Sequence, residues 1–408
     1  MRAIEFHEYG APEVLKLVDT ETPAPSPGEV TIDVAYAGVN FADVKARAEG
    51  YRVETLPFRP GLDVSGRVRA VGEGVTGLAP GQEVAAFLPG GGYAETVRAE
   101  ATATVPLPEG LDLRTAATLP TVLPTAHALL HEVGRLRTGE TVLVHGAAGG
   151  IGTVAGQLAR AAGAGAVYGV ASTPAKAEYA LKHGYDEVFT PDTFAADVHR
   201  ATNGKGVDLV LDPVGGETLR QVLEALALYG RLVSFGSASG AGPWRAGVPE
   251  LGARGRPVSA FTLLGLAASA PDELRALTER AYAKVLDGAV SLPVTAEFPL
   301  AEAARAHRLL GGRASTGKLL LRVAGQRHAR SARAGPRAST PGGDGTFRRR
   351  SKLFSGRVGP CHSASRNDHR HRRNDEEPHQ GADPDRRHRR LPRARDRSGL
   401  RRRHGHHL

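Results

Sequence analysis

A glycine-rich turn at residues 147–152 is the segment whose residue types and spacing best suit ligand binding. Residues 141–144, Thr-Val-Leu-Val, are apolar or β-branched and predict a buried parallel strand before the turn. Apolar residues recur at helical spacing after it, which predicts a helix. Without side chains in the turn, backbone N–H groups and the positive end of the helix can reach a pyrophosphate. The Ala-x-Gly-x-x-Gly pattern therefore predicts a dinucleotide site formed by Ala148, Gly149, Gly150, Ile151 and Gly152.

The segment after the next predicted strand, residues 166–170, bears on the choice between NADH and NADPH. An Asp or Glu about 20 residues beyond the glycines would bind the ribose 2′-hydroxyl and repel a 2′-phosphate. This sequence has Ser172 and Lys176 there instead, a hydroxyl and a cation. The two residues favour NADPH. The alternative is that Lys176 is an ordinary solvated helix residue.

Other candidates lie at the predicted carboxyl edge of the same sheet. Phe235, Gly236 and Ser237 come at the end of the predicted strand 231–235, and Gly216 follows the preceding strand. Ligands bind at this edge in open α/β sheets. We therefore expect all four residues to contact the cofactor.

Lys45 and Tyr51 are candidates for contact with the reacting substrate. A lysine can stabilise a developing oxyanion, and a tyrosine hydroxyl can hydrogen-bond a substrate oxygen. In each case the alternative is a side chain that simply faces water. The sequence shows no Ser-Tyr-Lys, Ser-His-Asp or Cys-His system, so it assigns no proton donor.

The sequence predicts no bound metal. The single cysteine, Cys361, lies in the C-terminal segment, and His127 and His131 are four residues apart but lack a third ligand. Without a metal to polarise a carbonyl, alcohol oxidation is the less favoured chemistry.

The elements that must position these residues follow two patterns. Up to residue 105, short strands alternate with glycine and proline turns, which predicts a partly barrel-like β domain. Residues 113–130 predict helices broken at Pro120 and Pro124. A βαβ rhythm then predicts a parallel sheet with helices on both faces. Its strands are expected at 141–144, 166–170, 187–189, 208–211 and 231–235, and its helices at 153–162, 174–183, 193–201 and 216–228. Later elements are expected at 273–286, 301–310 and 318–323.

The basic character of the chain is concentrated in residues 326–408. The formal net charge is +10, and this segment has 23 of the 53 Lys and Arg residues but only 8 of the 43 Asp and Glu residues. It lacks apolar periodicity and predicts a disordered tail. Its basic runs are typical either of a nucleic-acid-binding arm or of a solvated extension. Because no aromatic residues are interleaved, we expect no specific nucleic-acid partner.

Composition also bears on location. The sequence has no apolar run of about 18 residues, so we expect no membrane span. Residues 1–6 lack the apolar segment of a signal peptide. One cysteine cannot form a disulfide within the chain, which favours a cytoplasmic protein.

A series of segments, in order along the chain, resembles the zinc-independent quinone oxidoreductases of the medium-chain dehydrogenase/reductase superfamily, the zeta-crystallin-like group. These segments are 38–43, 60–66, 71–75, 91–95, 143–152, 212–216 and 313–318. The resemblance extends over residues 1 to about 323. It implies an α/β fold with a GroES-like β-barrel-type domain (1–122), a Rossmann doubly wound parallel sheet (123–285), a return to the first domain (286–325) and the tail (326–408).

The resemblance also implies roles for single residues. Asn40 matches the residue that lines the nicotinamide site, and Thr125 the residue near the carboxamide. Lys176 and Arg313 match the 2′-phosphate pocket. The alternatives are that Asn40 stabilises a turn and that Thr125 starts a helix. Pro191 departs from the Tyr or His common at its position, which weakens the NADPH preference. Relatives are commonly dimers, so we expect a homodimer.

Zinc-dependent relatives have a cysteine near Val39–Asn40 and Gly-His-Glu near residues 61–63, where this chain has Asn and Leu-Asp. We therefore predict an NADPH-dependent, zinc-independent reductase. It transfers hydride from nicotinamide C4 to a small-molecule quinone or α,β-unsaturated carbonyl. The alternatives are an enoyl or alkenal reductase on the same scaffold, and a non-catalytic nucleotide-binding protein.

Overall fold

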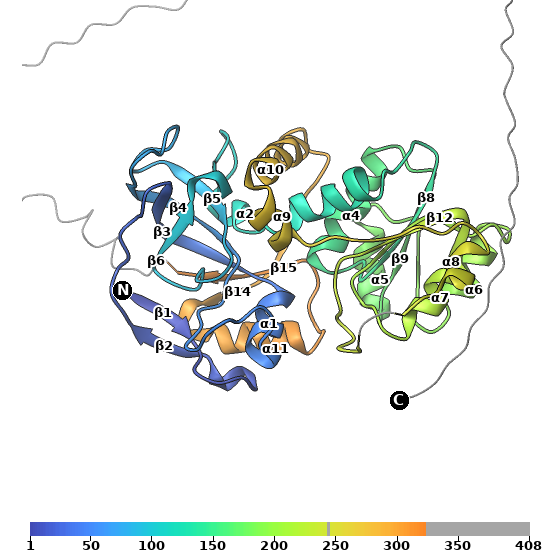
Figure 1. Ribbon diagram of the computed structural model, residues 1–408, viewed down its shortest axis with the longest axis horizontal. Coiled ribbons are helices and arrows are strands. Elements are labelled where there is room, and N and C mark those ends of the chain that lie inside the picture. The colour runs from blue at the N-terminus through green and yellow to red at the C-terminus, as the bar shows by residue number, and fades with distance from the viewer. Residues whose placement is uncertain (243–244, 324–408) are drawn as a thin grey trace, which may run out of the picture. The chain divides into compact units, whose positions relative to one another are not determined.

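The computed structural model describes residues 1–242 and 245–323, which form two large β-sheets with helices packed on them (Figure 1). The predicted tail, residues 326–408, lies outside the described residues. In the described part of the chain, no helix is both long and apolar enough to cross a membrane.

The first sheet is seven-stranded and antiparallel around β3 (Glu29–Val39). Its order is β14-β15-β3-β4-β5-β7, and β6 also pairs with β3. Its core includes Val30, Ile32, Val64 and Tyr93, all fully buried. The other strands are β4 (Asp63–Val71), β5 (Glu83–Phe87), β6 (Thr96–Glu100), β7 (Thr104–Pro106), β14 (Val294–Pro299) and β15 (Lys318–Arg322), and β1 (Arg2–Glu5) forms a separate pair with β2 (Lys16–Asp19).

Two helices from opposite ends of the described chain accompany this sheet. They are α1 (Phe41–Glu49) and α11 (Ala303–Gly311), which lie side by side (Figure 1). Strand β15 comes from the last described residues, yet it inserts between β14 and β3 and pairs Leu319 with Val39. The end of the chain therefore returns to the first sheet.

The second sheet is six-stranded and wholly parallel, in the order β10-β9-β8-β11-β12-β13. The strand order reverses between β8 and β11, which is the topological switch point of a Rossmann sheet. This sheet confirms the predicted fold class. The strands are β8 (Thr141–His145), β9 (Ala166–Val170), β10 (Glu187–Phe189), β11 (Val207–Asp212), β12 (Leu226–Ser234) and β13 (Val258–Ala260).

Helices cover both faces of the second sheet because alternate strand residues are apolar on each face. Val142, Leu209 and Val233 pack with residues of α3, α4 and α10, whereas Leu143 and Val210 pack with residues of α6 and α7. The helices are α2 (Leu113–Ala116), α3 (Val122–His127), α4 (Gly150–Ala161), α5 (Pro174–Leu181), α6 (Phe194–Ala201), α7 (Thr218–Ala225), α8 (Val248–Gly252), α9 (Leu263–Ser269) and α10 (Pro271–Leu286).

Two local predictions were wrong. Pro124 does not break a helix, because it lies in the first turn of α3, where N–H groups have no intrahelical acceptor. The predicted helix 216–228 ends at Ala225, and β12 begins at Leu226 instead of Arg231. Leu226 is fully buried and pairs with Val207, so tertiary packing converts this apolar segment into strand.

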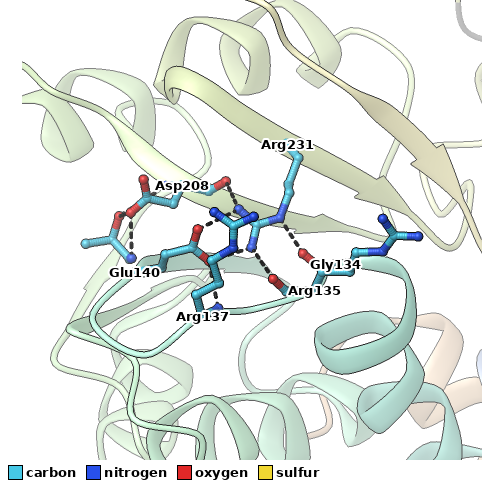
Figure 2. Close-up of polar contacts among 7 residues, drawn as sticks. Gly134, Arg135, Arg137, Glu140, Asp208 and Arg231 are labelled. Atoms are coloured by element: carbon cyan, nitrogen blue, oxygen red, sulfur yellow. Dashed lines mark hydrogen bonds and ion pairs between the residues drawn. The ribbon is translucent and has the colours of Figure 1, made fainter. Parts of the chain in front are cut away.

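Arg231 on β12 binds the loop before β8 (Figure 2). Its guanidinium donates to both carboxylate oxygens of Glu140, at 3.1 and 2.5 Å, and to the carbonyl oxygens of Arg135 and Asp208, at 2.9 and 3.1 Å. It also donates to the carbonyl of Gly134. The loop precedes β8, so these contacts lie at the opposite end of that strand from the glycine-rich turn. They stabilise the sheet without belonging to the candidate site.

Candidate functional site

The glycine-rich turn connects β8 to α4 at the switch point of the sheet. Gly149 is the N-cap residue of α4, which begins at Gly150. A Cβ atom at Gly149 would meet only the Gly146 carbonyl oxygen, at 3.3 Å, so this face of the turn is open. A Cβ atom at Gly152 would lie 2.3 Å from that same oxygen, which excludes every other residue. The turn thus exposes the first N–H groups of α4, including that of Ile151, to an anion.

The segment around Gly317 contacts the glycine-rich turn. The N–H of Gly317 donates to the carbonyl oxygen of Ala148 at 2.9 Å, and Gly317 forms a parallel bridge with Gly149. Gly317 has φ = +53°, a left-handed conformation that favours glycine. The segment that leads into β15 therefore holds the turn in place.

Two cationic residues, Lys176 and Arg313, are in contact through a backbone carbonyl. The Lys176 ammonium donates to the carbonyl oxygen of Arg313 at 2.6 Å, and the Arg313 guanidinium donates to the carbonyl oxygen of Ala238 at 2.9 Å. Burial, and secondarily the charge of Arg313, lower the pKa of Lys176. Neither residue forms an ion pair within residues 1–242 and 245–323. Ser172 lies exposed at the end of β9. The Lys176 side chain is thus positioned by the protein, and the two cations can receive a dianion.

The loops at the carboxyl edge of the sheet are tightly connected. The N–H of Phe235 donates to the carbonyl oxygen of Asp212 at 3.0 Å. A Cβ atom at Gly236 would lie 2.8 Å from the Pro213 carbonyl oxygen, and one at Gly216 would lie 2.7 Å from the Ala241 side chain. These glycines allow the loops after β11 and β12 to approach each other closely.

Lys45 on α1 reaches this edge from the other domain. Its ammonium donates to the carbonyl oxygen of Ser237 at 3.0 Å and lies 3.4 Å from a carboxylate oxygen of Glu49. It also lies 5.7 Å from the centre of the Tyr51 ring, within cation–π range. Lys45 is therefore not a freely solvated side chain. Tyr51 is 40% exposed, and its ring forms one side of this group.

Asn40 occupies a buried polar cluster at the start of α1. Its Nδ2 donates to Asp63 at 2.7 Å, and its Oδ1 accepts from the Lys318 ammonium at 2.5 Å. The Asp43 carboxylate accepts from the Asn40 N–H at 2.9 Å, as one half of a capping box at the start of α1.

Thr125 lies four residues after Thr121 and is engaged within its own helix. Its hydroxyl donates to the carbonyl oxygen of Thr121 at 2.6 Å, and the residue is buried. It is the fourth residue of α3, so the helix-start alternative is wrong. The Thr121 hydroxyl donates to Asp63, which connects α3 to the Asn40 cluster.

Sequence reasoning missed Asp63, Thr121 and Lys318 as parts of the site. A signal was present, because Lys318 opens an otherwise apolar strand and Asp63 lies in an apolar segment. A charged residue in a buried strand implies a buried partner. The partner's identity, however, depends on strand pairing.

A second buried chain of polar groups continues from Asp43. Its carboxylate accepts from the Gly61 N–H at 2.9 Å and from the Tyr93 hydroxyl at 3.3 Å, and that hydroxyl lies 3.1 Å from His307 Nε2. Burial raises the pKa of Asp43 to about 7, although both backbone donors act in the opposite direction. Burial lowers the pKa of His307 to about 3.

A small pocket opens against helix α1. Tyr51, Phe58 and Leu62 form its apolar and aromatic walls, with Leu264 of α9 opposite and Asp43 and Arg52 as its charged residues. Concave sites with apolar walls and few polar groups are typical of small-molecule binding. This hollow has room for little more than a water molecule, so it marks one wall of the candidate substrate site rather than a formed pocket.

The side chains of the described residues do not form the ligand sets that metal ions require. Within 1–242 and 245–323, no three His, Cys, Asp or Glu side chains form a group able to hold a metal ion. The rings of His127 and His131 do lie close, with centres 4.5 Å apart. Burial lowers the pKa of His127 to about 4.

The chain matches two family models and close relatives. Residues 26–109 match the alcohol dehydrogenase GroES-like domain, and residues 150–281 match the zinc-binding dehydrogenase model. The chain is 36% identical over 323 residues to a quinone oxidoreductase of Pseudomonas aeruginosa, covering 78% of this chain and 99% of that protein.

Solved structures agree. Escherichia coli quinone oxidoreductase complexed with NADPH has a TM-score of 0.74 and 31% identity, covering 79% of this chain and 100% of that one. A mycobacterial protein complexed with NADPH has a TM-score of 0.75 and 35% identity, with the same coverages. The chain therefore belongs to the quinone oxidoreductases of the medium-chain dehydrogenase/reductase superfamily, a family of enzymes.

Proposed function

We propose that the chain is an NADPH-dependent, zinc-independent reductase of quinones or α,β-unsaturated carbonyls. The observation that supports it best is the adjacency of Gly317 and Lys318. Gly317 supports the glycine-rich turn, and the next residue binds the Asn40 cluster. The turn suited to a dinucleotide and the polar cluster of the first domain thus belong to one site.

The residues present fit NADPH. Gly149 leaves the turn open, and Lys176 and Arg313 supply two cations in segments that contact each other. We assign these two cations to the 2′-phosphate, with Ser172 as a further donor. Asn40 and Thr125 orient the nicotinamide end, where the bound cofactor supplies a hydride from C4.

Lys45 and Tyr51 serve the substrate in this proposal. The Tyr51 ring lines the pocket, and the Lys45 ammonium lies beside that ring. A positive charge held there by Ser237 and Glu49 stabilises negative charge that develops on a substrate oxygen. The Lys45 contact with the Ser237 carbonyl oxygen holds α1 against the loop after β12.

The test is NADPH oxidation by purified protein against a panel of quinones and enones, with alcohols plus NADP⁺ as the reverse comparison. We expect turnover with at least one quinone or enone and none with simple alcohols. Tight NADPH binding without turnover on any acceptor would instead indicate the non-catalytic alternative. A preference of more than tenfold in kcat/KM for enoyl substrates would indicate an enoyl or alkenal reductase.

We also propose a homodimer that forms at the edge of the parallel sheet. β13 is an edge strand whose partner is β12. Val258 on β13 and Leu228 and Tyr229 nearby in β12 are exposed by 38, 62 and 73%. Exposed apolar edges favour pairing with a second copy. Light scattering after size exclusion, with Val258→Lys as the disrupting variant, tests this. The cytoplasmic location stays a prediction from the sequence, to be checked by cell fractionation.

A further inference from the structure

Lys318 places a buried positive charge inside the Asn40 cluster. Its side chain is 3% exposed, and its ammonium lies 2.6 Å from an oxygen of Asp63, which is itself fully buried. The same ammonium donates to Asn40 Oδ1 at 2.5 Å. Asn40 Nδ2 in turn donates to that Asp63 oxygen, so the three groups form a closed triangle.

Strand pairing explains why these residues meet although 278 positions separate Asn40 from Lys318. β15 runs antiparallel to β3 with Leu319 opposite Val39. That register places the preceding residue of β15 opposite the residue that follows β3, which is Asn40. On the other side of β3, Asp63 of β4 is paired with Gly38.

The chemistry of the two neighbours determines the orientation of the Asn40 amide. An ammonium has only donors, and an ionised carboxylate has only acceptors. The Asn40 oxygen must therefore face Lys318 and its nitrogen must face Asp63, since the flipped amide would face two repulsive contacts. One amide hydrogen is used by Asp63, so what Asn40 offers to a ligand is its second N–H.

These residues do not fit zinc, although one matched family model is described as a zinc-binding dehydrogenase. Positions near 40 and 63 are those that resemble the zinc-ligand positions of zinc-dependent relatives. Zinc sites use thiolate, imidazole and carboxylate ligands. Here an amide and one carboxylate are already bound to an ammonium, and the other carboxylate oxygen accepts from Thr121.

We propose that Lys318 takes the place of a metal cation and is a positioning residue. It neutralises Asp63 and holds Asn40 as a fixed hydrogen-bond donor toward a carbonyl oxygen of the cofactor or substrate. This proposal rests on the proposed function for its kinetic consequence, but not for the orientation of the amide. Lys318 itself touches neither ligand.

The experiment compares Lys318→Met, the double variant Lys318→Met/Asp63→Asn and, as a control, Lys284→Met, at a half-exposed lysine of α10. The double variant removes both charges and avoids an unpaired buried carboxylate, so it remains measurable if Lys318→Met does not fold. We expect hydride transfer in a single turnover to slow by about 10- to 100-fold in both Lys318 variants, as for partners that orient ligands of reactive centres. The control should match the parent protein.

A second readout does not depend on turnover. The Asn40 side-chain NH₂ signals, identified by their loss in Asn40→Asp, should be distinct and protected from exchange in the cofactor-free parent. In the double variant they should exchange faster, because the Asp63→Asn amide can both donate and accept and no charged neighbour then imposes one orientation on Asn40. Parent-like Asn40 signals and parent-like hydride transfer in the double variant would overturn the proposal. If the parent reduces no acceptor, the proposed function fails, whereas the amide signals still decide the role of Lys318.

Discussion

The Lys45 ammonium and the Ser237 carbonyl oxygen are 3.0 Å apart, although 192 residues separate them in sequence. The contact joins α1 of the first domain to the loop after β12 of the parallel sheet. The sequence allowed Lys45 either a catalytic role or a side chain that simply faces water. The contact places it at the carboxyl edge of the sheet, where a nicotinamide cofactor is expected.

Replacing Lys45 with Met should lower kcat for quinone reduction by about 10- to 100-fold, because an oxyanion-stabilising charge is lost. The dissociation constant for NADPH should change little. Steady-state kinetics and fluorescence titration measure the two effects. Tyr51→Phe retains the aromatic wall and tests the hydroxyl alone. A Lys45→Met protein with unchanged kcat would refute the catalytic role.

Replacing Lys176 or Arg313 with Met should weaken NADPH binding more than NADH binding. Loss of one charge-assisted contact to the 2′-phosphate should cost about 1.5–3 kcal/mol, or roughly 10- to 150-fold in the dissociation constant. Fluorescence titrations with both cofactors measure the difference. If the parent protein binds NADH and NADPH equally, the NADPH assignment is wrong.

Purified protein should contain no stoichiometric zinc, and a chelator should leave activity unchanged. The physical reason is that the Lys318 ammonium already neutralises Asp63. Elemental analysis should use protein lacking residues 326–408, since that segment contains nine histidines and Cys361. One zinc ion per truncated chain would contradict the proposal that Asn40 and Asp63 bind Lys318 and not zinc.

Asp43→Asn should change how stability depends on pH. Since the pKa of Asp43 is raised in the folded state from 3.8 to about 7, the folded protein binds the extra proton between these values. The stability that Asp43 contributes is therefore present at low pH and is lost as pH rises from about 4 to about 7.

The difference in unfolding free energy between parent and Asp43→Asn should accordingly fall over that interval, by at most about 4 kcal/mol. His127, whose pKa is lowered and which lies outside the Asp43 chain of polar groups, titrates in both proteins and cancels. Urea unfolding at pH 4.5, 6 and 7.5 measures the difference. A difference that stays flat or rises with pH would show that the pKa of Asp43 is not raised in the folded state.

Arg231→Met should destabilise the fold without disabling the site. The change removes the guanidinium that donates to the carbonyl oxygens of Arg135 and Asp208 and to Glu140, which keeps only the Arg137 N–H (Figure 2). We expect a loss of about 2–4 kcal/mol in unfolding free energy. NADPH affinity and kcat at a temperature well below the unfolding midpoint should stay near parent values. Urea unfolding and kinetics on the same preparation test both parts, and a large loss of affinity would show that the loop before β8 influences the site.

The local sequence pattern was sufficient to predict the parallel sheet. The strands at 166–170 and 187–189 were predicted to the residue, and the glycine-rich turn lies where its composition indicated. Strand and helix periodicity, together with glycine at positions where a Cβ atom cannot fit, are properties of neighbouring residues. Where the local pattern was ambiguous, as at Leu226, packing against Val207 determined the outcome.

The sequence by itself determined the order of elements, the dinucleotide turn and the excess of cations over carboxylates near it, because each depends on residues close together in the chain. Only the tertiary structure decided that Lys318 binds Asn40 and Asp63, that Lys45 reaches Ser237, and that Arg313 meets Lys176. These contacts join residues up to 278 positions apart. Their partners depend on the register of β15 against β3 and on the packing of the two domains, which no local periodicity specifies.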